Sequence, residues 1–530
     1  METHLLLALP IVIPLAASVI ALLLRRVPKV QPWVNIVSMT ALTGVSIALM
    51  VTVNTGGIQA TTFGGWPFPF GITLVGDHLS AIMLLISSIM GLFLAIYAMG
   101  DMDADRIRFG FYPFMNLLMV GISGAFLTGD IFNLYVWFEV LLIASFVLMA
   151  LGNRRAQLTA NIKYVAINLV SSLIFLGGVG FLYGLTGSLN MAEIASILSE
   201  MEGAEGLLTT ISMLFLVAFG IKAAIFPLFY WLPASYHTPP PTIMALFAGL
   251  LTKVGVYAMI RVFTLFFAIE IGGYTQTILL WIAGLTMVTG VLGAAAQNDF
   301  RRILSFHIVS QIGYMIMGLA IFTPLALIGS MYYVVHNILA KSNLFLISGV
   351  TKRLQGTFTL KKLKGLYAHY PGLTILFLLS AFALAGFPPL SGFWGKLILA
   401  IAGLQAQEYI IVGVAFAVGI MTMFSMTKIW MYSFLPGGGP DDDQPADKPE
   451  SVPALPSNVR LLYVPIALVA VLIVGISLFI GPIYEVGNQA ATELMNADLY
   501  IDAVLGHEES LVEPAAGADL DSRTGGVHAQ

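Results

Sequence analysis

Five ionisable residues lie inside apolar segments of this sequence, where a charge is costly. Four are lysines (Lys222, Lys253, Lys341 and Lys396), and the fifth, Glu139, is the one carboxylate in the middle of such a segment. A cation at the centre of a membrane-spanning helix costs about 2.5–3.5 kcal/mol on insertion scales. Because such residues persist mainly where they line a polar pathway, the five side chains predict a route for protons or ions through a bilayer.

Lys222 precedes a proline inside a predicted spanning helix. The segment 219–241 reads FGIKAAIFPLFYWLPASYHTPPP, with Lys222 five residues before Pro227. A proline in mid-helix frees the carbonyl four residues earlier, here that of Ala223. Freed backbone at membrane depth is tolerated where it is buried in protein or lines a water-filled cavity. The pattern favours a hydrated half-channel over a packing kink with a lysine that reaches to the surface, because Lys222 lies far from the predicted helix end.

A second break lies five predicted spans later. The segment 380–396 reads SAFALAGFPPLSGFWGK, so Pro388 and Pro389 interrupt the twelfth span and Lys396 follows them. Broken helices at corresponding places in two halves are typical of transporters built from repeats. Five is an odd number, so the two copies would have opposite membrane orientations. Letter-by-letter similarity is weak, and the inverted repeats rest on the breaks and on sidedness.

Glu139 lies in the segment DIFNLYVWFEVLLIASF of the fifth predicted span. We expect Lys222 to be its partner and the pair to act as a switch, in which pairing favours the ammonium and separation lets its proton move on. The alternative is a static ion pair that holds two spans together. A buried ion pair is weak evidence for stability, since burying both charges is itself costly.

Lys253 and Lys341 lie on the eighth and eleventh predicted spans. A buried lysine without a fixed partner can take up and release a proton, because burial disfavours its charged form. His336 precedes Lys341 by five residues, about 140° around a helix, so the two do not share a face. His336 could relay protons through water, or it could be a core histidine with a satisfied hydrogen bond. His307 has a weaker claim to the same role.

The composition is that of a polytopic helical membrane protein. The chain has 530 residues, of which 58% are hydrophobic and 10% charged, against about 25% charged in soluble domains. Apolar runs long enough to span a bilayer recur throughout, and we predict about 14 of them. The first run, Leu5 to Leu24, has its positive charges after it, which is the reverse of a secretory signal, so we expect a retained helix.

Basic residues predict the sidedness. They follow odd-numbered spans, with Arg261 as the main exception, and are Arg25, Arg26, Lys29, Arg106, Arg108, Arg154, Arg155, Arg301, Arg302, Lys352, Arg353, Lys361, Lys362, Lys364, Lys448 and Arg460. The positive-inside rule places these loops in the cytoplasm and both termini outside. The predicted parts are three N-terminal helices (1–110), two five-helix repeats (111–267 and 275–435), a flexible cytoplasmic loop (436–460), a last helix (461–484) and an acidic tail (485–530). For the tail the composition favours disorder over a segment that folds on a partner.

Several chemistries lack a basis in the sequence. There is no Gly-rich phosphate loop, no cysteine, and no histidine pair at haem or metal spacing within the spans. We therefore expect no cofactor, no resident metal, no nucleic-acid partner and no enzymatic activity. A dehydrated Na⁺ site needs several oxygen ligands, which one mid-membrane carboxylate does not supply, so we expect the cation to cross in a partner chain.

Six motifs in order resemble one family. They are WFEV, KAAIFPLFYWLP, LLTKVGVY, RRILSFHIVSQIGYM, HNILAKSNLFL and GFPPLSGFWGK, and they are similar to the antiporter-like subunits of respiratory complex I and of Mrp cation/proton antiporters. The segments DIFNLYVWFEVLLIASF and SYHTPPP look closest to the D-type subunits of the Mrp antiporters. The resemblance implies 14 helices with two inverted five-helix repeats, and it places the family's functional residues at Glu139, Lys222, Lys253, Lys341 and Lys396.

These observations favour a proton-translocating subunit of a multisubunit Na⁺/H⁺ antiporter in a bacterial plasma membrane. Protons would pass Glu139, Lys222, Lys253 and Lys341, with His336 as a relay, and reach Lys396. The main rival is a membrane-arm subunit of a redox-driven complex I-like NADH:quinone oxidoreductase, because the coupling machinery would lie in partner chains. A scaffold subunit that no longer transports is less favoured, since it need not retain five costly charges.

Overall fold

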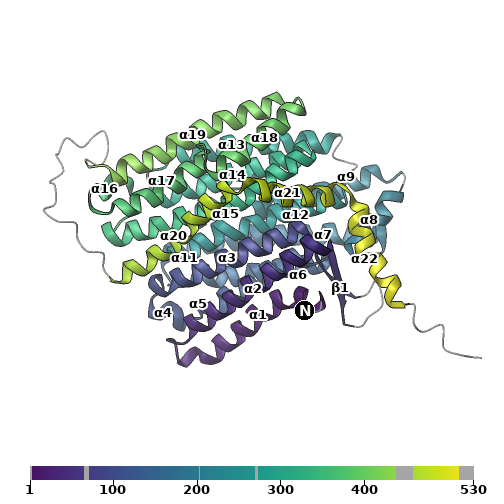
Figure 1. The fold of residues 1–530 in the computed structure, drawn as a ribbon, viewed down its shortest axis with the longest axis horizontal. Coiled ribbons are helices and arrows are strands. Elements are labelled where there is room, and N and C mark those ends of the chain that lie inside the picture. The colour runs from purple at the N-terminus through teal and green to yellow at the C-terminus, as the bar shows by residue number, and fades with distance from the viewer. Residues whose placement is uncertain (1–2, 65–70, 202, 269–272, 437–456, 513–530) are drawn as a thin grey trace, which may run out of the picture.

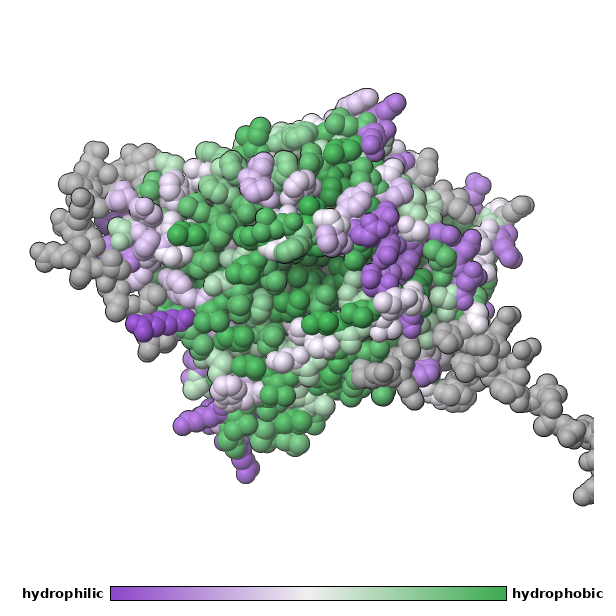
Figure 2. Space-filling view, in the orientation of Figure 1, coloured by the Kyte–Doolittle hydropathy of each residue, from purple (hydrophilic) through white to green (hydrophobic). Residues whose placement is uncertain are grey.

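The computed structural model describes residues 3–64, 71–201, 203–268, 273–436 and 457–512. This part of the chain is mostly helical, as predicted, and eleven of its helices are long and apolar enough to cross a membrane. Apolar side chains cover the middle of the molecule in Figure 2, and hydrophilic ones gather toward its two ends. The chain is therefore a multi-pass membrane protein.

The helices of the first half are α1 (Thr3–Leu23), α2 (Gln31–Gly56), α3 (His78–Asp101), α4 (Ala104–Arg108), α5 (Phe111–Leu127), α6 (Ile131–Ala150), α7 (Arg155–Thr186), α8 (Met191–Glu200), α9 (Glu205–Ala223), α10 (Trp231–Ser235), α11 (Pro241–Leu246) and α12 (Thr252–Leu265), with a 3-10 turn η1 (Leu24–Arg26) and a π-helical turn η2 (Phe247–Leu251). The second half holds α13 (Tyr274–Ala296), α14 (Phe300–Ile321), α15 (Pro324–Gln355), η4 (Leu360–Lys362), α16 (Leu366–His369), α17 (Pro371–Ala385), α18 (Ser391–Gln405), α19 (Tyr409–Phe434), α20 (Ser457–Leu478), α21 (Ile480–Met495) and α22 (Ala497–Val512).

Three helical segments form the centre of the bundle: α11–η2–α12, α14 and α15 (Figure 1). Their polar side chains are buried along with the apolar ones, including Lys253, His307, His336 and Lys341, each 0% exposed. The outer helices α1, α2, α7, α13, α19 and α20 instead present apolar side chains to the surroundings. These four candidate residues thus lie where protein surrounds them on all sides, whereas Glu139 and Lys396 are half-buried.

Both predicted helix breaks are present. Helix α9 ends at Ala223, and Ala224 takes a left-handed conformation with φ of 63°. Helix α17 ends at Ala385, and Gly386 takes φ of 91° before α18 begins at Ser391. The sequence predicted a kink at Pro227 that frees one carbonyl, and this prediction is wrong. The helix ends instead, and a helix end leaves up to four carbonyls without an intrahelical partner.

A small β-hairpin departs from the all-α prediction. Strands β1 (Gln59–Phe63) and β2 (Ile72–Gly76) pair antiparallel, with Gln59 opposite Gly76. The sequences QATTF and ITLVG are rich in β-branched residues, which favour strands. The hairpin, α8 and α22 lie at one end of the molecule, here named the hairpin end, and α4 and α16 lie at the opposite, basic end (Figure 1).

The predicted disorder of the tail is wrong for its first part. Residues 485–495 belong to α21, and residues 497–512 form α22, which lies at the hairpin end (Figure 1). Small residues make this packing possible: Ala490 and Ala491 are fully buried, and Gly487 lies against Ile328 of α15. The predicted flexible loop falls largely on residues 437–456, and the rest of the tail on residues 513–530, which lie outside the described residues.

Candidate functional site

Lys222 lies in the last turn of α9, beside the first helix break. Its side chain is buried, and its Nζ donates a hydrogen bond to the Ser172 hydroxyl on α7 at 3.1 Å. The ammonium also lies 5.2 Å from the centre of the Phe138 ring. The carbonyl of Ile221 next to it accepts from the Trp231 indole at 3.0 Å. The Trp231 indole therefore pairs with a carbonyl at the helix break, and the Lys222 ammonium contacts only the Ser172 hydroxyl and the Phe138 ring among the described residues.

Glu139 does not form the predicted ion pair with Lys222. Within the described residues no carboxylate oxygen lies within 4.0 Å of the Lys222 ammonium, although the two groups are close enough to interact electrostatically. Glu139 is half-buried on α6, and its Oε1 is buried with no hydrogen-bond partner in the described part of the chain. The static ion pair that the sequence left open is thus absent from this conformation, because Lys222 turns to Ser172 instead.

A small cavity of about 20 Å³ adjoins Lys222. It is lined by Phe138, Leu141, Leu142, Tyr164, Asn168, Lys222, Trp231, Tyr236 and Leu251. A cavity of this volume is large enough for one water, which needs polar partners to stay. The cavity connects the side of α6 that carries Phe138 with Leu251 at the end of η2, two residues before Lys253.

Lys253 is held by the π-helical turn η2. It is fully buried, and its Nζ donates to the carbonyl of Ala248 in that turn at 2.6 Å. A π-helical turn inside an α-helix is uncommon and is frequently found at functional sites. The turn was not predicted from the sequence FAGLL, which carries no proline to signal it.

Helix α12 approaches the first break at Gly255. A Cβ built on Gly255 would lie 2.7 Å from the backbone nitrogen of Ala223 and 3.0 Å from the carbonyl carbon of Lys222. Only a residue without a side chain permits this contact. The glycine therefore brings the backbone that carries Lys253 against the backbone that carries Lys222.

Lys341 lies on α15, between the two halves of the molecule. It is fully buried, and its Nζ has no hydrogen-bond partner among the described residues. Lys253 and Lys396 both lie within electrostatic range of it. The neighbouring Ser342 hydroxyl donates to the carbonyl of Ala245 on α11 at 3.1 Å, which holds this turn of α15 against the η2 region.

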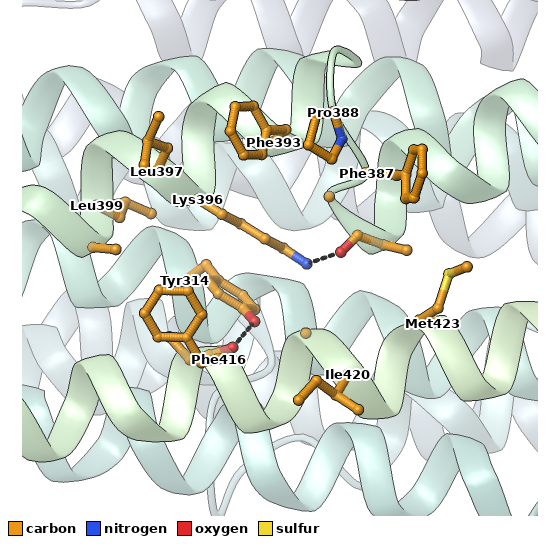
Figure 3. Close-up of a pocket in the computed structure, with 15 residues that line it drawn as sticks. Tyr314, Phe387, Pro388, Phe393, Lys396, Leu397, Leu399, Phe416, Ile420 and Met423 are labelled. Atoms are coloured by element: carbon orange, nitrogen blue, oxygen red, sulfur yellow. Dashed lines mark hydrogen bonds between the residues drawn. The ribbon is translucent and has the colours of Figure 1, made fainter.

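Lys396 lies at the second break, on α18. Its Nζ donates to the carbonyls of Ala385 at 2.8 Å and Leu384 at 3.3 Å, both at the end of α17, and lies 5.0 Å from the centre of the Tyr314 ring. Figure 3 shows the Lys396 side chain reaching into a cavity of about 450 Å³. Apart from the Lys396 ammonium and the Tyr314 hydroxyl, that cavity is mostly apolar, with Phe387, Phe416 and Met423 among its lining residues.

His336 also meets the second break. Its Nδ1 is 2.8 Å from the Ser391 hydroxyl at the start of α18, while its Nε2 is buried without a partner in the described residues. Lys341 and Lys396 are both within electrostatic range. Only one of the two His336 ring nitrogens thus has a hydrogen-bond partner, whereas a purely structural core histidine would be expected to have both paired. His307, for which the sequence makes a weaker case, is fully buried in the same neighbourhood, and neither of its ring nitrogens has a partner among the described residues.

Two further charged groups were not predicted as sites. Arg261, the exception to the sidedness pattern, is buried and forms an ion pair with Asp77 at 2.5 Å. Lys428 on α19 donates to the carbonyls of Ala295 and Gln297 near the basic end. The sequence does signal Arg261, as an arginine inside an apolar segment. It does not signal the ion pair, because Asp77 lies 184 residues away. The described residues hold no group of three or more His, Asp or Glu that could bind a metal ion.

Chemically, the arrangement is a lysine belt made of Lys222, Lys253, Lys341 and Lys396, with one carboxylate, that of Glu139, at its edge. Within the described residues, a hydroxyl or backbone carbonyl accepts a hydrogen bond from every lysine of the belt except Lys341. A multi-pass helical protein with such a belt is of the membrane-transport class. The chain belongs to the NADH:quinone oxidoreductase/Mrp antiporter transmembrane family, whose model matches residues 128–422.

Relatives and a solved structure agree with this membership. The chain is 44% identical to the Na⁺/H⁺ antiporter D subunit of Alkalihalophilus pseudofirmus and 39% identical to that of Bacillus subtilis, and each match covers 94% of this chain and 98% of the relative. The fold matches a chain of the Mrp complex from a Dietzia species with a TM-score of 0.85 at 31% identity, covering 95% of this chain and all of the other. The two relatives are named as antiporter subunits, not as enzymes.

Proposed function

We propose that this chain is the D-type subunit of an Mrp-type Na⁺/H⁺ antiporter and that it carries protons along the lysine belt. The observation that carries the proposal is that Lys222, Lys253 and Lys341 are buried, Lys396 is half-buried, and no carboxylate of the described residues lies within ion-pair distance of any of the four. A fixed carboxylate would hold each lysine charged. Hydroxyl and carbonyl partners accept hydrogen bonds from an ammonium or from a neutral amine, so they permit both states.

The proton path begins at Glu139 and Lys222. A change in the distance between these two charges alters how strongly Lys222 holds its proton, because an opposite charge favours the ammonium. The water-sized cavity beside Lys222 and the close approach at Gly255 lead from there to Lys253.

From Lys253 the path continues to Lys341 and Lys396. The mutual repulsion of neighbouring ammonium groups means that a proton on one disfavours a proton on the next, which drives handoff along the line. His336 lies beside Lys341 and Lys396 and is placed to relay by its free Nε2. The cation itself crosses in a partner chain, since the described residues offer no cluster of acidic ligands that could hold it.

The repeat organisation belongs to the same proposal. Three N-terminal spans (α1 to α3) precede five spans from α5 to α12, five from α13 to α19 and the last span α20, which makes 14 when each broken or bent helix counts once. The repeats cover 111–267 and 275–435. Support comes from the breaks in the fourth span of each unit, between α9 and α10 and between α17 and α18. The basic end then faces the cytoplasm of a bacterial cell, and the hairpin end faces outside.

The test uses the intact multisubunit complex in membrane vesicles. Lys222→Met and Glu139→Gln should each lower ΔpH-dependent Na⁺/H⁺ exchange at least ~10-fold while the complex still assembles. Lys163→Met is the matched control, because Lys163 is an exposed lysine of α7 that lies over the Tyr230 ring outside the belt. Wild-type exchange in both belt variants would refute the proposed path.

The rival function, a proton pump driven by a redox partner, predicts that different subunits copurify with this chain. Purification of the native assembly should yield only membrane subunits of the antiporter. Co-purification of flavin or iron–sulfur subunits would instead favour the complex I-like alternative.

A further inference from the structure

A line of polar side chains leads from Lys253 toward the hairpin end. Lys253, Tyr257 and Arg261 are spaced by four residues on α12, so they share one face of the helix and span about 12 Å along its axis. All three are buried, with exposed fractions of 0%, 3% and 5%. The proposed path through the belt does not use the last two, although burial of a cation at that depth is costly.

Arg261 is locked to the start of α3. Its guanidinium lies 2.5 Å from Asp77 Oδ2, and Asp77 also caps α3 by accepting from the backbone N–H of Ser80 at 2.9 Å. Rings of Tyr257 and Tyr500 lie 5.7 Å and 5.3 Å from the guanidinium. Burial acts to raise the pKa of Asp77, but Arg261 and the Ser80 hydrogen bonds outweigh it and lower that pKa. The pair therefore stays charged and is an anchor, not a proton carrier.

The next residue, His78, is linked to the C-terminal helix α21. Its Nδ1 lies 2.7 Å from Glu493 Oε1, and its backbone N–H donates to Glu493 Oε2 at 3.0 Å. The His78 side chain is 6% exposed and that of Glu493 11%. The pair thus joins a buried imidazole to a carboxylate that is partly open at the hairpin end.

His78 has one ring nitrogen left over. Its Nε2 and the Oε1 of Gln489, one turn before Glu493 on α21, are both buried and close to each other, and neither makes a hydrogen bond of ordinary geometry in the part of the chain that the structure describes. Two unmatched polar atoms of this kind can share a water. The imidazole therefore has a fixed acceptor on one side and, on the other, a nitrogen beside the Gln489 amide that is free to bind a water.

The charges around His78 allow it to titrate. It faces Glu493 from α21, Asp77 from its own N-terminus and, beyond Asp77, Arg261 from α12; the phenols of Tyr257 and Tyr500 are neutral. Asp77 and Arg261 cancel one another. One negative charge remains beside the ring, enough to favour a proton on His78 without an obligatory second cation.

We propose that His78 and Glu493 form the outer proton-exchange pair of the antiporter, through which protons pass between the lysine belt and the outside solution. This inference rests on the proposed function and adds the outer end of the proton path. A water that has received a proton from the belt passes a proton to His78 Nε2, and the imidazolium passes its Nδ1 proton to Glu493, which releases it to outside water. A ring flip returns the protonated nitrogen to Glu493. One proton enters and one leaves, and the reverse sequence serves uptake.

The experiment compares His78→Gln and Glu493→Gln in the complete complex in vesicles of known sidedness. A glutamine at 78 can still donate to Glu493, and a glutamine at 493 can still accept from the backbone N–H of residue 78, but neither titrates. We expect exchange to fall at least ~10-fold and its dependence on outside pH to flatten. Asp498→Asn, which removes an exposed acid two residues before Tyr500, is the control and should match wild type.

Three outcomes separate the possibilities. Wild-type rates and pH profiles in both variants would overturn the outer pair, while a loss in Lys253→Met alone would leave the proposed function standing. An equal loss at every pH together with a lowered melting temperature would also overturn it, because the pair would then be structural. Full activity in Lys222→Met and Lys253→Met would refute the proposed function itself.

Discussion

Lys396 Nζ donates a hydrogen bond to the carbonyl of Ala385, 2.8 Å away across the break between α17 and α18 (Figure 3). Lys253 does the same with Ala248 inside the π-helical turn at 2.6 Å. In both cases an irregular stretch of helix supplies the acceptor, and no carboxylate is needed. Because a carbonyl accepts from an ammonium and from an amine alike, these contacts hold the side chain in place through a change of charge.

The first prediction separates charge from proton exchange at position 396. Arginine at this site keeps a cation that can reach the same carbonyls, but its guanidinium cannot be deprotonated. Lys396→Arg should therefore lower Na⁺/H⁺ exchange at least ~10-fold, as should Lys396→Met, while assembly of the complex is retained. The measurement is the exchange rate in vesicles normalised to complex content.

Lys428 offers the matched control for that prediction. It too donates to two backbone carbonyls, at 2.8 Å and 3.1 Å, but it lies outside the belt, near the basic end. Lys428→Arg should exchange at close to the wild-type rate. An active Lys396→Arg complex would show that position 396 needs a charge only.

The second prediction concerns the contact between α12 and the first break. Gly255→Ala places a Cβ 2.7 Å from the backbone nitrogen of Ala223, and overpacking of this kind typically costs about 1–3 kcal/mol. We expect a lower melting temperature of the purified complex and slower exchange, because Lys222 and Lys253 are pushed apart. Gly180→Ala on α7, where no atom lies within 4 Å of the new Cβ, should be neutral or slightly stabilising. Equal behaviour of the two variants would contradict the proposed role of Gly255.

Much of this architecture could be predicted from the sequence, since hydrophobic length and proline position act locally. The two breaks at Pro227 and Pro388 follow from the missing amide donor of proline. The burial of Lys341 follows from its place in an apolar run, because a cation facing lipid would be costly. These are properties of a segment that do not depend on what packs against it.

The rest depends on tertiary contacts. Nothing in the sequence near Lys222 shows that Ser172 takes its hydrogen bond in place of Glu139. Likewise, the tail residue Glu493 meets His78 across 415 positions, and composition alone favoured disorder there. Amphipathic helices that gain stability from packing are hard to distinguish from disordered acidic segments before their partners are known.

The third prediction tests the anchor between Arg261 and Asp77. Removing one partner of a buried ion pair leaves an uncompensated charge and costs about 3–5 kcal/mol. Arg261→Met should thus lower the melting temperature of the complex strongly. The double variant Arg261→Met/Asp77→Asn should recover most of the loss, because asparagine at 77 can still cap α3. Failure of the second substitution to restore stability would show that Arg261 acts through packing with Tyr257 and Tyr500.

The last prediction is a pH dependence at the hairpin end. Asp130 precedes α6 and is 7% exposed; burial raises its pKa from the ordinary 3.8 to about 6, although backbone N–H groups of Phe132 and Asn133 act to lower it. An acid with a raised pKa adds stability below its ordinary value and loses it as the pH rises through the folded value. The shift of roughly 2 units corresponds to about 3 kcal/mol.

Asp130→Asn provides the comparison for that effect, because asparagine can still accept the backbone N–H of Asn133 but does not titrate. Between about pH 4 and pH 7 the melting temperature of the wild-type complex should fall relative to that of the variant, with most of the change between the ordinary pKa and the raised one, at about pH 4 to 6. Other titrating groups are common to both proteins, so their contributions cancel in the difference. Parallel melting curves across this range would mean that water solvates Asp130 and that its carboxyl titrates normally.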